Sequence, residues 1–189
     1  MQRSLKAHLE DPRQQAMYGI VHGGSDADLR RHSAEFVTGL PFDGFAVGGT
    51  LGKDMAEMEQ LLAPVLPRLP ARKPRHVLGI GDDRSMEALV RLGADTFDSC
   101  YPTRVGRHGT ALTSGGRVRV LASRFSRAFD RPLDRACRCP TCQNHSIGYI
   151  NHLIRAKEPL AGDLISLHNL HFMCNSMREL RQAVLLDRI

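Results

Sequence analysis

The sequence contains no tryptophan, and aromatic residues of all kinds make up only 5% of its 189 residues. A core therefore has to be built mainly from Leu, Val, Ile, Met and Ala, and 42% of hydrophobic residues favours a globular chain over a disordered one. No apolar run approaches the roughly 20 residues that a membrane-spanning helix needs, and residues 1–6 lack the apolar centre of a signal peptide. We therefore expect no membrane partner.

Cysteine is also scarce, and its number, five, is odd. Three of the five form a tight C-x-C-x-x-C cluster, Cys137, Cys139 and Cys142. Thiols this close cannot easily pair with one another as disulfides, but their thiolates can surround one tetrahedral metal ion. Because Cys100 and Cys174 stand apart, the pattern favours a metal site in a reducing, cytoplasmic compartment over a disulfide framework.

The fourth ligand of this cluster is expected to be a histidine. His168 follows Cys142 after 25 intervening residues, and three thiolates with one imidazole suit a closed, structural Zn²⁺ site. Spacing alone leaves competing ligands, which are His145, His152 and His171.

Positive charge is in excess, with a formal net charge of +6. Six arginines fall within residues 103–127, which also show the pattern of a β-hairpin with strands at 110–113 and 118–121. A basic balance favours RNA or DNA as a partner, and the alternative is a soluble protein with a solvated basic face.

The order of the remaining segments predicts an α/β fold. Short β-type runs at residues 18–24, 44–49, 76–81 and 96–101 are separated by helical patterns at 26–40, 55–66 and 85–92. This alternation predicts βα units and a parallel sheet, although no G-x-G-x-x-G fingerprint is present. Two further helices are expected at residues 146–157 and 168–186.

Asp98 stands at the end of the fourth predicted strand. A carboxylate at the carboxyl end of a barrel strand is well placed to act as nucleophile, base or ligand binder. Capping of the following turn is an equally good interpretation from the residues alone.

Several of these segments together resemble the tRNA-guanine transglycosylases, also called queuine tRNA-ribosyltransferases. Residues 97–104 read F-D-S-C-Y-P-T-R and are followed by G-R-H-G at 106–109, which is similar to the active-site region of that family. Residues 42–49, F-D-G-F-A-V-G-G, and 73–81, K-P-R-H-V-L-G-I-G, match as well, as does the cysteine cluster with His168-Asn169-Leu170. The matches are collinear and cover almost the whole chain.

The resemblance implies a TIM barrel with a zinc-binding subdomain, of which this chain would be the C-terminal half. Residues 1–102 would hold about four βα units, and residues 103–189 the RNA-contacting hairpin, the zinc-binding subdomain and the C-terminal helices. The implied enzyme is a pentosyltransferase and a homodimer. It exchanges guanine at the wobble position of a tRNA with a GUN-type anticodon for queuine or another 7-deazaguanine precursor.

The resemblance also assigns roles to residues. Asp98 would attack the ribose and form a covalent intermediate, and His22 and Gly49 would bind the base. Two segments would contact the RNA, and their residues are Gly79, Ile80, Gly81, Asp82, Asp83, Arg84 and Ser85 in one, and Thr103, Arg104, Val105, Gly106 and Arg107 in the other.

The sequence departs from the family pattern at two points. His22 stands where most bacterial members carry glutamine, and in this it resembles a chlamydia-like subgroup. We hypothesise that the base used is queuine or another late precursor, rather than the usual aminomethyl precursor. The family's Asp-Ser-Gly-Gly-Phe-Gln motif, which holds the general base, does not occur. We therefore expect this chain to be inactive and poorly soluble alone, and the alternative is a non-catalytic, zinc-containing tRNA-binding partner subunit.

Overall fold

A computed structural model describes all 189 residues of the chain. Its internal contacts divide the chain into two compact units. The first contains residues 1–80 and 84–99, and the second contains residues 81–83 and 100–189. None of the helices has the length and apolar character needed to cross a bilayer.

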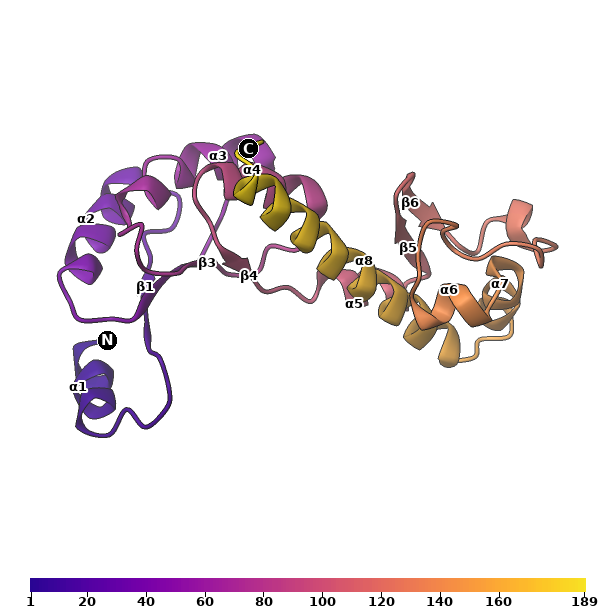
Figure 1. Cartoon of the computed structure of the whole chain (residues 1–189), viewed down its shortest axis with the longest axis horizontal. Coiled ribbons are helices and arrows are strands. Elements are labelled where there is room, and N and C mark those ends of the chain that lie inside the picture. Colours follow the sequence, from indigo (N-terminus) through magenta and orange to yellow (C-terminus); the bar gives the residue numbers. More distant parts are fainter. The chain divides into compact units, whose positions relative to one another are not determined.

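The first unit is a four-stranded parallel sheet, and the helices that connect its strands lie on one face (Figure 1). The strands pair in chain order, β1-β2-β3-β4, as expected for successive βα units. Its elements are α1 (Gln2–Glu10), β1 (Tyr18–Val21), α2 (Ala27–Thr38), β2 (Gly44–Val47), α3 (Met55–Leu62), the 3₁₀ turn η1 (Leu66–Arg68), β3 (Arg75–Val77), α4 (Asp83–Arg91) and β4 (Thr96–Phe97).

The alternation of side chains along the strands sorts them onto two faces of the sheet. Val21, Phe45 and Val47 point toward the helices and form one buried core with residues such as Val37 and Leu62. The strand register places a different row, Ile20, Ala46, His76 and Thr96, side by side across all four strands. Because residues two apart share a face, Asp98 projects on the same side as Thr96.

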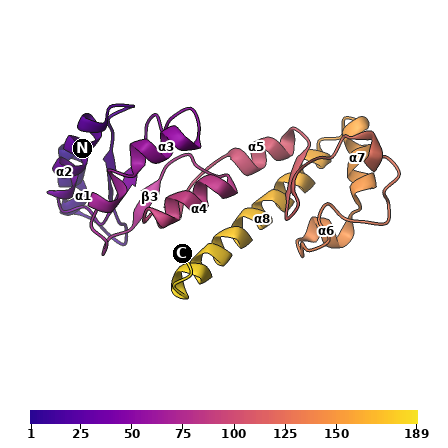
Figure 2. The ribbon, with the colours of Figure 1, turned by 90° about the horizontal axis from the view of Figure 1, so that it is seen from above.

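The second unit combines an antiparallel hairpin with helices around a separate core. Figure 2 shows its longest helix, α8, running beside the short helix α5. The elements are α5 (Tyr101–Arg107), β5 (Thr110–Thr113), β6 (Gly116–Arg119), the 3₁₀ turn η2 (Ser123–Phe125), α6 (Pro140–Asn144), α7 (Ile147–Arg155) and α8 (Leu160–Leu185).

Helix α5 contains residues 103–107, one of the two segments that the resemblance assigns to RNA contact. Gly106 lies where α5 meets α8, and a Cβ there would stand 2.7 Å from Ser166 Oγ and 2.9 Å from its backbone nitrogen. The buried Asn169 amide on α8 donates to the carbonyls of Pro102 and Thr110, at 2.9 Å each. Close helix packing and this buried amide explain why a glycine-containing segment is helical.

The predicted α/β class and parallel sheet are confirmed, whereas helices α1, α5 and α6 were not predicted, and other differences concern element ends. Strands β1, β2 and β3 stop before the glycines that end their predicted runs, and these glycines lie in the loops that follow. The second hairpin strand starts at Gly116 rather than residue 118, and α8 starts at Leu160 rather than residue 168.

Candidate functional site

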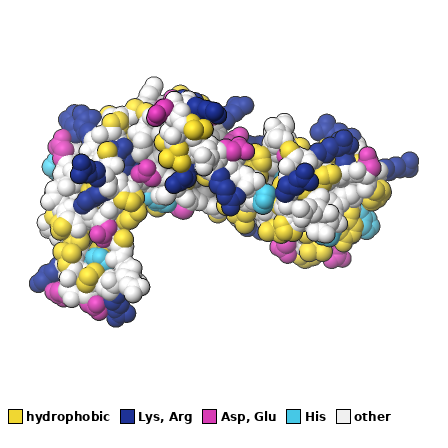
Figure 3. All heavy atoms as spheres, in the orientation of Figure 1, with side chains coloured by type: hydrophobic (Ala, Val, Ile, Leu, Met, Phe, Trp, Pro, Cys, Tyr) yellow, Lys and Arg dark blue, Asp and Glu magenta, His cyan; other side chains and the backbone are white.

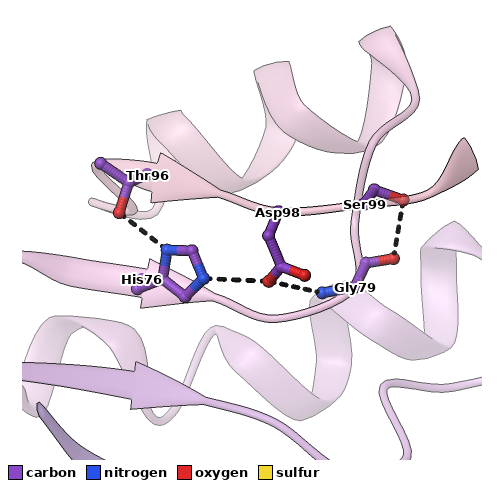
Figure 4. Close-up of polar contacts among 5 residues, drawn as sticks. All are labelled: His76, Gly79, Thr96, Asp98 and Ser99. Atoms are coloured by element: carbon purple, nitrogen blue, oxygen red, sulfur yellow. Dashed lines mark hydrogen bonds and ion pairs between the residues drawn. The ribbon is translucent and has the colours of Figure 1, made fainter. Parts of the chain in front are cut away.

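Asp98 directly follows β4, at the carboxyl end of the parallel sheet (Figure 4). Its Oδ1 lies 3.0 Å from His76 Nε2 and accepts a 3.2 Å hydrogen bond from the backbone N–H of Gly79. No hydrogen bond engages Oδ2, and the side chain is 60% exposed, so that this oxygen is accessible to a substrate.

His76 is held in place from its other side by Thr96. Its Nδ1 lies 2.9 Å from Thr96 Oγ1, and the two residues are register partners between β3 and β4 (Figure 4). A hydroxyl that donates to Nδ1 leaves the proton of a neutral imidazole on Nε2, facing Asp98. The sequence interpretation missed His76 and Thr96 as site residues. The signal was available in the parallel pairing, which aligns His76, Thr96 and Asp98 on one face.

His22 and Gly49 lie together at the ends of β1 and β2. Both are exposed, and a Cβ at Gly49 would stand 3.8 Å from His22 Nδ1. Gly49 has φ of +82°, a conformation that favours glycine. The two residues assigned to base binding are therefore neighbours at the same end of the sheet as Asp98.

A buried arginine that the sequence analysis did not single out fixes these loops. Arg30, on α2, is fully buried and donates to the carbonyls of Gly24 at 2.7 Å and Gly48 at 3.3 Å, and also to Thr50. Burial lowers the pKa of its guanidinium, but an arginine stays charged in proteins. The carbonyls that accept its hydrogen bonds belong to the two loops that contain His22 and Gly49.

The residues assigned to RNA contact occupy two elements. Residues 79–82 form the turn between β3 and α4, and residues 83–85 begin α4 itself. Residues 103–107 lie in α5, where Arg104 and Arg107 are exposed, three positions apart, and in no ion pair. Residues three apart share a helix face, so the two guanidinium groups can act on one ligand.

The second unit brings together the four groups of the expected metal site, Cys137, Cys139, Cys142 and His168, whose ligand atoms all lie within 4.8 Å of one another. His168 Nδ1 lies 3.5 Å from Cys139 Sγ and 3.3 Å from Cys142 Sγ. Zinc bond lengths place sulfur and nitrogen ligands of a tetrahedral site roughly 3.5 Å apart. The residues present therefore fit a Zn²⁺ ion.

The surroundings of this cluster suit a metal as well. His168 Nε2 lies 2.7 Å from the carbonyl of Leu112, which keeps the proton there and leaves Nδ1 free. Burial lowers the pKa of His168, which favours the neutral imidazole that a metal needs. Burial raises the pKa of Cys142 to about 12 and also raises that of Cys137, so zinc would have to displace their protons.

The competing histidines have other contacts. His145 stacks on Tyr149, with ring centroids 5.5 Å apart, and His152 is exposed on α7. His171 Nδ1 lies 3.6 Å from Cys137 Sγ, beside the cluster, and is not one of its four groups.

Comparison with known proteins identifies the family of the chain. The family model described as Queuine tRNA-ribosyltransferase matches residues 1–189. A queuine tRNA-ribosyltransferase of Protochlamydia amoebophila is 49% identical over 187 residues, which cover 99% of this chain and 48% of that protein. One from Chlamydia trachomatis is 44% identical over 188 residues, covering 99% and 50% respectively. The chain spans about half the length of the curated relatives it matches. The chain belongs to the queuine tRNA-ribosyltransferase family.

Proposed function

We propose that this chain carries the nucleophilic half of a tRNA base-exchange site. The site would replace guanine at the wobble position of a GUN-type anticodon with queuine or another 7-deazaguanine. The observation that carries the proposal is the setting of Asp98, whose Oδ1 is held by His76 and Gly79 while Oδ2 stays accessible. Membership of the family supports the same pentosyl transfer.

The proposed reaction has two displacements at the ribose C1′ atom. Asp98 Oδ2 attacks C1′, the bond from C1′ to guanine N9 breaks, and the electron pair stays on guanine, which leaves after protonation. The nitrogen of the incoming base then attacks C1′ and loses its proton, and the carboxylate leaves with its electron pair. Carboxylate nucleophiles act in this way in retaining glycosidases, where they trap an oxocarbenium-like centre.

His76 has a distinct role in this scheme as a positioning residue. Its Nε2–H, 3.0 Å from Oδ1, fixes the rotation of the carboxylate so that Oδ2 faces the substrate. The same hydrogen bond is stronger to a carboxylate than to an ester, so it also favours release of Asp98 in the second displacement. Thr96, through His76 Nδ1, keeps the imidazole in orientation.

The base would bind between His22 and Gly49. Gly49 leaves its backbone exposed for a flat ring to approach, and His22 can donate or accept a hydrogen bond at the edge of that ring. A His22→Gln variant should shift the preference from queuine toward the aminomethyl precursor in a competition assay. A wild-type preference for the aminomethyl base would contradict this part of the proposal.

The RNA would contact residues 79–85 and the exposed face of α5. Arg104 and Arg107 form no ion pair, so their planar guanidinium groups are available for bidentate hydrogen bonds to phosphates or bases. A functional division at residue 102 would separate the base-binding residues and the 79–85 segment from the part that contains the RNA-contacting arginines of α5 and the metal site.

The four parallel strands are proposed as half of a TIM barrel that the rest of a longer polypeptide completes. One Zn²⁺ ion on Cys137, Cys139, Cys142 and His168 would be structural, because four protein ligands leave no open position for chemistry. We also propose that the complete enzyme is a homodimer and is located in the cytoplasm. The second candidate function is that of a non-catalytic subunit, which would bind tRNA through the same basic surface.

The two candidates separate in one experiment. We would express the chain fused to the segment of the Protochlamydia amoebophila protein that it does not match, and measure release of labelled guanine from tRNA. The enzyme proposal predicts base exchange by the fusion, loss of exchange in Asp98→Asn, and unchanged tRNA binding. A folded, zinc-loaded fusion that binds tRNA but exchanges no base would favour the binding subunit.

A further inference from the structure

The second unit contains a cavity of about 510 Å³ that no step of the proposed reaction uses. It lies among the β5–β6 turn, η2, residues 131–135 and the start of α7. Three arginines, Arg124, Arg131 and Arg135, line it, together with the apolar side chains of Phe125, Leu133 and Ile147. Its volume is in the range of pockets that hold a small ligand.

The three arginines have no acidic partner. None of them takes part in an ion pair, although Asp134 also lines the cavity. The Asp134 carboxylate is already engaged, since it accepts hydrogen bonds from Ser114 N at 2.8 Å and Ala136 N at 2.9 Å. Three guanidinium groups and one carboxylate line the cavity, so its lining carries a net positive charge that a bound anion would relieve.

Two of these arginines lie over an aromatic ring. The guanidinium carbon of Arg124 is 4.8 Å from the centroid of Phe125, and that of Arg131 is 5.2 Å from it. A guanidinium that lies over a ring can keep its N–H groups available at its edge, and it offers a planar surface. Phosphate oxygens fit the edge of such a group, and an unpaired base can stack on its plane.

The walls of the cavity are fixed before any ligand binds. Asp134 joins the β5–β6 turn to the segment that follows it, and Ile147 N donates a 2.9 Å hydrogen bond to the carbonyl of Arg131. Figure 3 shows Lys and Arg side chains gathered over the hairpin and the η2 segment at the right of the view. The cavity is thus a preorganised part of a basic surface.

We propose that this arginine cavity, defined by Arg124, Phe125, Arg131 and Arg135, is a binding site for a phosphate-bearing nucleotide of the RNA substrate. The assignment to RNA rests on the proposed function of the chain. The cavity holds one nucleotide, with its phosphodiester on the guanidinium edges and its base against a guanidinium plane. This site adds to the contacts at α5 and at residues 79–85.

Chemical footprinting tests the proposal on the full zinc-loaded chain. Phenylglyoxal modifies accessible guanidinium groups, and mass spectrometry reports the extent of modification at each arginine. An unmodified tRNA transcript should protect Arg124, Arg131 and Arg135 several-fold, while exposed Arg181, on α8 outside the cavity, is modified as in the free chain. Bound tRNA that leaves the three arginines as reactive as before would overturn the proposal.

Matched variants supply the second measurement. Arg124→Gln with Arg131→Gln should weaken tRNA binding about tenfold or more, because the contacts of two guanidinium groups with the phosphate are lost. Each lost phosphate contact should also reduce the slope of log K against log salt by about 0.7 to 0.9. Arg127→Gln with Arg181→Gln removes the same charge from exposed positions outside the cavity and should change affinity less than threefold. Arg124→Lys with Arg131→Lys should bind weakly as well, because a lysine lacks the flat fork. Zinc content verifies that each variant is folded.

The outcomes separate the cavity from the proposed function. Equal losses in the two glutamine variants would reject the cavity while tRNA binding itself stands. Protection by polyglutamate and not by tRNA would reject RNA in favour of an acidic protein partner. A fusion that exchanges no base and a chain that binds no tRNA would reject the proposed function, and the RNA site with it.

Discussion

His76 Nε2 lies 3.0 Å from Asp98 Oδ1, on the open face of a sheet whose other face is covered by helices. His76 lies within β3 and Asp98 directly follows the adjacent parallel strand β4, and the backbone N–H of Gly79 donates to the same oxygen. The pair gives the carboxylate one held oxygen and one accessible oxygen, which is the arrangement that a nucleophile requires.

Replacing His76 should therefore slow the reaction without weakening the binding of RNA. In the fusion that contains the complete site, His76→Phe is expected to lower kcat by about 10- to 100-fold, the range for one charge-assisted hydrogen bond. The KM for tRNA should stay within about threefold. Thr96→Val is the graded control, because it leaves His76 in place and removes only its orienting hydroxyl. A raised KM with unchanged kcat would show that His76 serves RNA binding instead.

Arg30 makes a prediction about stability. Arg30→Met leaves the carbonyls of Gly24, Gly48 and Thr50 without their donor and should lower the free energy of unfolding by about 2–4 kcal/mol. Urea unfolding of the chain, followed by circular dichroism, measures the change. Arg31→Met is the matched control, because Arg31 is half exposed and pairs only with Asp28 at the surface, so its loss should cost less than about 1 kcal/mol.

The metal site should bind zinc more tightly as pH rises. The pKa values of Cys137 and Cys142 are raised, so both thiols are protonated at pH 7 in the metal-free chain, and zinc must release those protons. The affinity should therefore rise by at least about two log units per pH unit near neutrality, because at least these two protons leave. Calorimetry in buffers of different ionisation enthalpy counts the protons. Release of fewer than one would contradict the assignment of these thiols as ligands.

The close contact of α5 with α8 depends on the absence of a side chain at Gly106. Gly106→Ala would place a Cβ within 3.0 Å of three Ser166 atoms and should destabilise the chain by about 1–3 kcal/mol, as overpacking does. Gly115→Ala is the control, because the nearest atom to its Cβ is Thr113 Oγ1 at 3.8 Å. Equal thermal stability of the two variants would show that the helices separate easily.

Motifs and residue periodicity predicted the parts of the molecule that depend on local sequence. The four strands, the hairpin and the cysteine cluster follow from alternation, turn residues and short spacing. His76 was missed because its partner Asp98 lies 22 residues away and is found only through the pairing of β3 with β4. Arg30 was missed because an arginine on an amphipathic helix normally faces solvent, and only the two loops around it explain its burial.

The helix at residues 101–107 could not be predicted from the sequence either, because it also depends on distant contacts. Glycine and proline in Y-P-T-R-V-G-R favour a loop locally, but Pro102 occupies the first turn of α5, where its missing N–H costs nothing. Packing of Gly106 against Ser166, 60 residues away, then decides the conformation. Such long-range contacts cannot be obtained from spacing along the chain.

The central claim is that Asp98 forms a bond with the substrate ribose. The direct measurement is to incubate the complete fusion with end-labelled tRNA, denature the mixture with detergent, and look for labelled RNA that migrates with the protein. We predict a protein–RNA adduct in the wild type and in His22→Gln, and its absence in Asp98→Asn. Peptide mapping should place the adduct on the peptide containing Asp98. An adduct of equal yield in Asp98→Asn, or one mapped to another residue, would contradict the account.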